Sequence, residues 1–210
     1  MQKYDSIIFD LDGTLWDSVG SVVKLWNKAL ISAGIEPTMS YDELSRCMGL
    51  RIGQIFDKVI PTSTDEQRHQ IQEYCRLHEE EFLGDHGGIL YDGVEQTLRQ
   101  LKESYRLYIV SNCQDSYIQG FFKAHGLEKY FDGYECAGRT GLSKGENIRL
   151  VTEREGLKFP VYIGDTALDF ISANEAGVDF ILAAYGFGEV ENASVKAEKF
   201  TDLTEILDCR

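Results

Sequence analysis

Residues 4–14 read YDSIIFDLDGT, a short apolar run that ends in two aspartates and a glycine. The run from Tyr4 to Phe9 predicts a buried strand, and the polar stretch after it predicts a loop. Four further short apolar segments follow later in the chain and alternate with helical patterns: Leu107–Val110, Tyr134–Ala137, Val161–Ile163 and Phe180–Ala184. Because such alternation is typical of a parallel sheet covered on both faces, we expect an α/β fold with a doubly wound, Rossmann-like core.

A block of helical patterns without a convincing strand separates the first strand from the others. Apolar residues at helical spacing predict helices over 19–33, 41–48, 52–60 and 65–82. In the last of these, five residues are expected to share one face: Ile71, Tyr74, Cys75, His78 and Phe82. We therefore expect a helical cap of residues 16–87, inserted after the first strand into a core of residues 1–15 and 88–210.

The charge balance restricts the partners that we expect. Among 210 residues, 21 are Lys or Arg and 35 are Asp or Glu, which gives a formal net charge of −14. A surface this acidic disfavours nucleic acid and anionic membranes, and it repels an anionic substrate unless a cation reverses the local field. The five cysteines show no CxxC spacing, which favours reduced thiols. With no apolar run long enough to span a membrane, we expect a cytoplasmic monomer or small homo-oligomer.

Four polar features follow predicted strands or lie in loops: the segment from Asp10 to Thr14, the pair Ser111-Asn112, Lys144, and Asp165 with Asp169. Ligands bind at the carboxyl ends of the strands in open parallel sheets, so one sheet edge can gather all four. Carboxylates brought close together repel one another, and a divalent cation relieves the repulsion. Oxygen ligands suit Mg²⁺, which also binds phosphate oxygens. Lys144 adds a positive charge, and Ser111 and Asn112 offer hydrogen-bond donors to a phosphoryl group. Together these features indicate phosphoryl transfer.

The two aspartates of the first motif are expected to have different roles. Side chains at i and i+2 of an extended segment point the same way. We assign Asp10 as the nucleophile that forms an aspartyl phosphate. Asp12 would protonate the leaving alcohol and then deprotonate the attacking water.

The motifs FDLDGT, SN after a strand, a later lysine and GDTALD occur in an order that resembles the haloacid dehalogenase superfamily. The closest likeness is to the phosphoglycolate phosphatase-like group, which has a helical cap after the first motif. This resemblance implies that Mg²⁺ is held by the Asp10 carboxylate, the Asp12 carbonyl and Asp165. It also implies that Ser111 and Lys144 bind the phosphoryl group, that Lys144 steadies Asp10, and that Asp169 orients Lys144 or lies outside the metal ligands. We also expect Thr14 among the substrate-binding residues.

The function expected from this pattern is a Mg²⁺-dependent phosphatase that acts on a small phosphorylated metabolite. A sugar phosphomutase resembling β-phosphoglucomutase is the alternative, although such mutases often have valine at the position of Thr14. A haloacid dehalogenase is disfavoured by Asp12, since a halide leaving group needs no acid. A phospho-accepting signalling module is a further alternative, but such modules lack a large helical insertion like the one expected here. Two readings remain open for Arg46 and Arg51 in the insertion. One of them reaches over the distal end of the substrate, or both belong to a solvated helix face.

Overall fold

The computed structural model describes residues 4–208 and shows a six-stranded parallel sheet. Its strands are β1 Ser6–Phe9, β4 Arg106–Ser111, β5 Gly133–Cys136, β6 Pro160–Gly164, β7 Asp179–Ala183 and β8 Lys196–Ala197. They lie in the order β5-β4-β1-β6-β7-β8, with β1 between β4 and β6. The predicted doubly wound α/β fold is confirmed.

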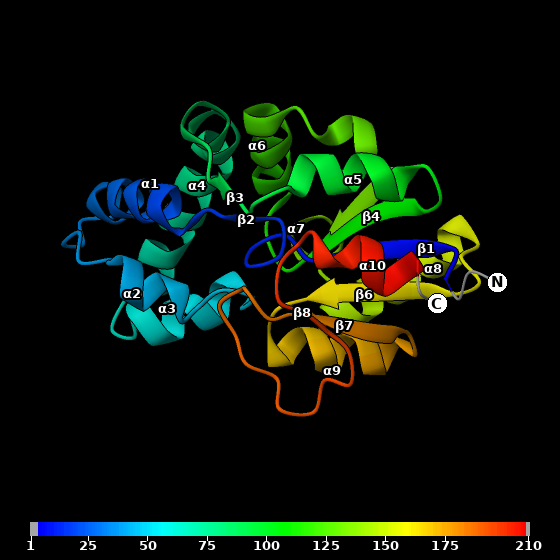
Figure 1. The fold of residues 1–210 in the computed structure, drawn as a ribbon. Coiled ribbons are helices and arrows are strands. Elements are labelled where there is room, and N and C mark those ends of the chain that lie inside the picture. Colours follow the sequence, from blue (N-terminus) through cyan, green and yellow to red (C-terminus); the bar gives the residue numbers. More distant parts are fainter. Residues whose placement is uncertain (1–3, 209–210) are drawn as a thin grey trace.

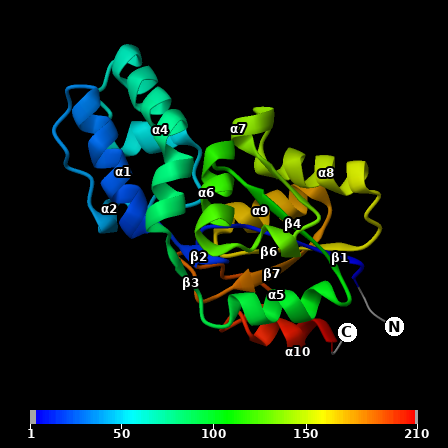
Figure 2. The same ribbon diagram turned by 90° about the horizontal axis from the view of Figure 1, so that it is seen from above.

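Helices cover both faces of the sheet (Figure 2). They are α5 Val94–Lys102, α6 Asp115–His125, α7 Ala137–Thr140, α8 Lys144–Glu155, α9 Ala167–Ala176 and α10 Asp202–Asp208, with a 3-10 turn at Glu128–Tyr130. Along β1 the side chains alternate between the two faces. Ile7 and Phe9 belong to the core cluster that includes α5 and α10, whereas Ile8 packs with residues of α8 and α9. The central strands β1, β4, β6 and β7 are buried on both sides for this reason, as their mainly apolar sequences indicate.

Four helices lie between β1 and β4 in the chain and form a group beside one end of the sheet (Figure 1). They are α1 Val19–Ser32, α2 Tyr41–Ser45, α3 Ile52–Val59 and α4 Asp65–His86. Side-chain caps at Ser40 and Thr64 determine where α2 and α4 begin. The helix α4 runs four residues beyond the predicted end at Phe82, because the apolar Leu83 continues its buried face.

Two expectations for this region are wrong. The strand β2, Trp16–Asp17, lies within the block in which no strand was expected, and it pairs antiparallel with β3, Ile89–Leu90. Two residues are too few to produce a recognisable alternation, so only the pairing reveals this ribbon. His78 was expected on the buried face of α4 but is exposed; the buried residues of α4 are Ile71, Cys75, Glu79 and Leu83.

Two further observations concern the whole described chain. Within residues 4–208, no helix combines the length and the apolar composition needed to cross a membrane. The cysteines Cys47, Cys75, Cys113 and Cys136 are free thiols, and Cys209 lies outside the described residues.

Candidate active site

The ends of three neighbouring strands bring the predicted site residues together. In the sheet register, Phe9 of β1 lies opposite Ile109 of β4 and Ile163 of β6. Asp10 extends this register, since its backbone N–H donates to the carbonyl of Ile163 at 2.8 Å. Ser111 is the last residue of β4, and Asp165 directly follows β6. All three residues therefore lie at the carboxyl edge of the sheet, which faces the helices α1–α4 (Figure 1).

Lys144 forms a buried ion-pair network with two of the aspartates. Its Nζ lies 3.0 Å from Asp10 Oδ1 and 2.6 Å from Asp169 Oδ1. Lys144 is the first residue of α8, and the cap formed by Ser143 and Glu146 determines where this helix begins. Burial and the charge of Asp169 raise the pKa of Asp10 to about 7, although Lys144 opposes that shift. Burial disfavours the ammonium charge, but the two aspartates outweigh it and raise the pKa of Lys144.

Asp165 is enclosed by backbone that approaches it closely. Gly13 adopts a φ of +76°, and a Cβ at this position would lie 2.1 Å from Asp165 Oδ2. Only glycine fits there, because it combines the left-handed backbone with the absence of a side chain. The same Oδ2 accepts a hydrogen bond from the Phe187 backbone N–H at 2.7 Å, while Oδ1 is buried without a hydrogen-bond partner. Burial, with Asp169 and Asp10 nearby, raises the pKa of Asp165 well above its usual range.

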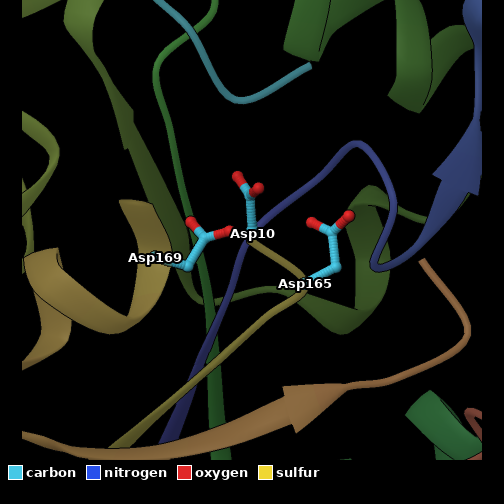
Figure 3. A group of neighbouring side chains, drawn as sticks. All are labelled: Asp10, Asp165 and Asp169. Atoms are coloured by element: carbon cyan, nitrogen blue, oxygen red, sulfur yellow. The ribbon is translucent and has the colours of Figure 1, made fainter. Parts of the chain in front are cut away.

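Asp10, Asp165 and Asp169 place carboxylate oxygens within 4.8 Å of one another, with Asp165 and Asp169 on either side of Asp10 (Figure 3). The third carboxylate of this group is Asp169, whereas Asp12 is expected to face the cation with its backbone carbonyl and not with its side chain. Asp169 is already engaged, since it accepts hydrogen bonds from Thr166 N and Oγ1 in addition to Lys144. Asp10 Oδ1 and Asp165 Oδ1 are buried without a well-aligned hydrogen bond. Oxygen donors with free lone pairs and mutual repulsion fit a divalent cation between Asp10 and Asp165.

The Asp12 side chain lies apart from this group and has hydroxyl partners. Ser18 Oγ donates to Asp12 Oδ1 at 2.6 Å, and the Tyr117 hydroxyl donates to the same oxygen at 2.8 Å. Burial raises the pKa of Asp12, while both hydroxyl groups partly offset that effect. A carboxyl group with a raised pKa and fixed orientation is suited to giving and taking a proton.

The three other residues predicted to contact the substrate differ in where their side chains lie. Ser111 is buried at the sheet edge, next to the cavity described below. Asn112 uses its side-chain amide to donate to the Gly49 carbonyl at 2.8 Å, so it joins β4 to the segment between α2 and α3. Thr14 is fully buried with no hydrogen-bond partner for its hydroxyl, and it does not line that cavity.

A cavity of about 80 Å³ lies between the helices α1–α4 and the sheet edge. Asp12, Ser111 and Tyr117 form its wall on the side of the sheet. The opposite wall is mainly apolar and includes Trp26 and Leu50. The cavity therefore adjoins the Asp12 carboxyl group and is open to part of a small ligand.

Three residues of this region were not predicted: Ser18, Tyr117 and Glu79. Ser18 and Tyr117 are hydroxyl residues on different elements, and no sequence pattern connects them to Asp12. Glu79 had a detectable signal, because it fills the missing i+4 position in the apolar series Ile71, Cys75 and Leu83.

Comparisons with known proteins agree with this geometry. The sequence model of the haloacid dehalogenase-like hydrolases matches residues 7–183. A plasmid-encoded phosphoglycolate phosphatase of Cupriavidus necator is 24% identical over 96% of this chain and 90% of its own. The pyrophosphatase PpaX of Listeria monocytogenes is 28% identical over 61% of this chain and 58% of its own.

A solved structure shows the same fold. The haloacid dehalogenase-like hydrolase from Streptococcus pneumoniae superposes with a TM-score of 0.83 and 24% identity, over 98% of this chain and 99% of its own. The family match spans both the sheet edge with its aspartates and the helices beside it. This chain belongs to the haloacid dehalogenase-like hydrolase family.

Proposed function

We propose that this protein is a Mg²⁺-dependent phosphatase that hydrolyses a small phosphate monoester through an aspartyl phosphate on Asp10. The observation that carries the proposal is the pairing of Asp10 with Lys144 at 3.0 Å, beside the unpartnered Oδ1 of Asp165. The relatives named as phosphoglycolate phosphatase and pyrophosphatase support phosphate hydrolysis. Because these two names refer to different substrates, they do not identify the group that is attached to the phosphate in the substrate of this protein.

In the first step the Asp10 carboxylate attacks phosphorus and the bond from phosphorus to the alcohol oxygen breaks. Asp12 gives its proton to the departing oxygen, so a neutral alcohol leaves and Asp12 becomes a carboxylate. Lys144 stays charged beside Asp10 and attracts the phosphoryl oxygens. Ser111, at the end of β4, offers a hydroxyl donor to the same oxygens.

In the second step water attacks phosphorus of the aspartyl phosphate, and Asp12 takes the proton that this water loses. The bond between phosphorus and Asp10 breaks, which releases inorganic phosphate and restores both carboxyl groups. Asp10 and Asp165, with the Asp12 carbonyl, would hold Mg²⁺, which when bound neutralises charge on the phosphoryl group. Asp169 orients Lys144 through their contact of 2.6 Å.

The helices α1–α4 serve as a cap over this site, with residues 16–87 as the inserted unit. Three contacts support this assignment: Asn112 with Gly49, Ser116 with Glu79, and Arg51 with the carbonyls of Gly141 and Leu142. The ribbon of β2 and β3 joins the two ends of the insertion and is the natural position for a hinge.

The proposal is tested by turnover of p-nitrophenyl phosphate with Mg²⁺. We expect activity that excess EDTA abolishes and Mg²⁺ restores, and no activity in Asp10→Asn. The matched control is Asp92→Asn, an exposed aspartate outside the site, which should retain full activity. Intact-protein mass spectrometry after rapid acid quenching should detect a phosphate adduct in the active protein and none in Asp10→Asn. An active Asp10→Asn protein would remove Asp10 as the nucleophile.

A further inference from the structure

The cavity beside Asp12 contains one carboxylate that the reaction above does not use. Glu79 of α4 lines this cavity and is 4% exposed. Six side chains of α1, α2, α3 and the loops between them form most of the remaining wall on the cap side: Val22, Trp26, Leu44, Met48, Leu50 and Ile55. Because Asp12 protonates the leaving oxygen, the rest of the alcohol must extend into this space, toward Glu79.

Glu79 has little compensation for its burial. Ser116 Oγ donates to Glu79 Oε2 at 2.6 Å, and within residues 4–208 this is its one side-chain hydrogen bond. In the same part of the chain, no Lys, Arg or His side chain lies within ion-pair distance of Glu79 or lines the cavity. Burial, opposed in part by Ser116 and reinforced by the charge of Asp12, raises the pKa of Glu79 to about 7. A buried carboxyl group without a cation favours a ligand that supplies one.

The basic residues of the cap are turned away from the cavity. The Arg51 guanidinium donates to the carbonyls of Gly141 and Leu142, and both Arg46 and Lys58 are exposed. Neither Arg46 nor Arg51, for which a substrate contact and a solvated face were both left open, lines the cavity. A substrate with a carboxylate at its distal end would meet Glu79 and find no cation in the cavity.

We propose that Glu79 determines the specificity of this enzyme and selects the phosphate monoester of a small amino alcohol, whose ammonium group pairs with the Glu79 carboxylate. The inference rests on the phosphatase activity proposed above.

Glu79 also has a structural role, since its bond to Ser116 joins α4 to α6. The two roles differ in what they predict. A purely structural link affects all substrates alike, whereas a specificity residue changes the ranking of substrates by the charge of their distal group.

The experiment uses four substrates with the same phosphoryl group: 2-aminoethyl, 2-hydroxyethyl, n-propyl and carboxymethyl phosphate, the last being phosphoglycolate. We expect kcat/KM for the aminoethyl ester to exceed that for the propyl ester by about 10- to 100-fold, as for a hydrogen bond to a charged group. Phosphoglycolate should be the poorest substrate. In Glu79→Gln the preference for the ammonium group should be lost and the rate with phosphoglycolate should rise.

Ser116→Ala is the matched control, because it removes the link between the helices and keeps the Glu79 carboxyl group; since the loss of this donor raises the pKa of Glu79 further, the comparison is made at alkaline pH, where the carboxylate is ionised. It should retain the order of the four substrates. Equal rates for the four esters, or phosphoglycolate as the best substrate, would overturn the inference even if Glu79→Gln failed to fold. The inference would also be overturned if the Glu79→Gln substitution lowered the rates with all four esters equally. If the wild-type protein hydrolyses p-nitrophenyl phosphate without ranking the esters, only this inference fails; if it hydrolyses no ester at all, the proposed function fails with it.

Discussion

Asp10 and Asp12 are two residues apart in the chain but have different surroundings. Asp10 lies beside the Lys144 ammonium group, whereas Asp12 accepts hydrogen bonds from the Ser18 and Tyr117 hydroxyl groups. Burial raises the pKa of both carboxyl groups, but the charge of Lys144 opposes the shift most directly at Asp10, whereas hydroxyl donors oppose it at Asp12. A fixed cation favours the ionised form that a nucleophile needs, and neutral donors fix the orientation of the second carboxyl group. This difference agrees with the roles proposed for Asp10 in attack and for Asp12 in proton transfer.

Replacing Tyr117 by Phe tests this division of roles. The change removes one donor to Asp12 and should raise the pKa of that carboxyl group further, because Tyr117 lowers it. We expect kcat/KM to fall by about tenfold, the effect of a lost hydrogen bond of about 1.5 kcal/mol, and the alkaline limb of its pH profile to move to higher pH. Tyr134→Phe is the control, since the Tyr134 hydroxyl contacts Asp115 and Gln119. An unchanged pH profile in Tyr117→Phe would show that Tyr117 does not tune Asp12.

At the scale of elements, the packing of α4 against α6 connects the cap to the sheet. Gly120 of α6 lies where a Cβ would be 2.8 Å from Leu83 Cβ and 3.4 Å from the Glu79 carbonyl oxygen. Glycine permits this close approach, and the approach brings Glu79 to Ser116 and the cavity. The two helices therefore position the carboxyl group that we assign to specificity.

Gly120→Ala should destabilise the protein by about 1–3 kcal/mol, because overpacking outweighs the higher helix propensity of alanine. Gly20→Ala in α1 is the matched control, since a Cβ there meets nothing within 4 Å. That change should stabilise the protein by about 0.4–1 kcal/mol. Urea denaturation of the three proteins measures both effects, and a stabilised Gly120→Ala protein would contradict the close packing.

Glu79 should also make stability depend on pH. Its folded-state pKa of about 7 lies above the unfolded value, so the folded protein holds a proton that the unfolded chain releases. The stabilisation from this proton is complete below the unfolded pKa and is lost as pH rises through about 7. Glu79→Gln should therefore resemble the wild type at low pH and exceed it at pH 8, by up to about 3 kcal/mol. Urea denaturation at pH 4.5 and pH 8 measures this, and an equal difference at the two pH values would contradict it.

For the molecule as a whole, the carboxyl edge of the sheet concentrates acidic groups in a chain that already has a net charge of −14. The ammonium group of Lys144 offsets part of this charge, and a divalent cation between Asp10 and Asp165 would offset more. Cation binding should therefore stabilise the folded state as a whole, since the unfolded chain does not keep these aspartates together.

Millimolar Mg²⁺ should raise the Tm of the wild-type protein by about 5–10 °C if it exceeds the Kd about 100-fold, which corresponds to about 2.7 kcal/mol. Asp165→Asn should lose this shift. Without Mg²⁺, the same variant should be more stable than the wild type, because it removes a buried carboxylate that faces Asp10 and Asp169. Differential scanning calorimetry with Mg²⁺ or EDTA distinguishes these outcomes. An equal shift in both proteins would place the bound cation elsewhere.

Short-range patterns explain which elements were predictable. The run Ile7–Phe9 and the later apolar segments are long enough to identify strands of a buried parallel sheet. The two-residue strands β2 and β3 become strands only by pairing with each other, so no local pattern could identify them. On α4, His78 is exposed although it was expected to share a face with Ile71 and Cys75, because the packing of neighbouring helices also decides which face is buried.

The sequence by itself determined the fold class, the order of the motifs and the gathering of Asp10, Ser111, Lys144 and Asp165 at one sheet edge. The reason is that parallel strands all end on the same side of the sheet, so the residues at the ends of the neighbouring strands β4, β1 and β6 lie close together, and Lys144 joins them from the first turn of α8. Only the tertiary structure decided that the Asp169 carboxylate joins those of Asp10 and Asp165, and that Glu79 reaches the cavity while Arg51 contacts the carbonyls of Gly141 and Leu142. These choices depend on side-chain contacts between segments far apart in the chain, such as those of Asp12 with Tyr117 and Glu79 with Ser116.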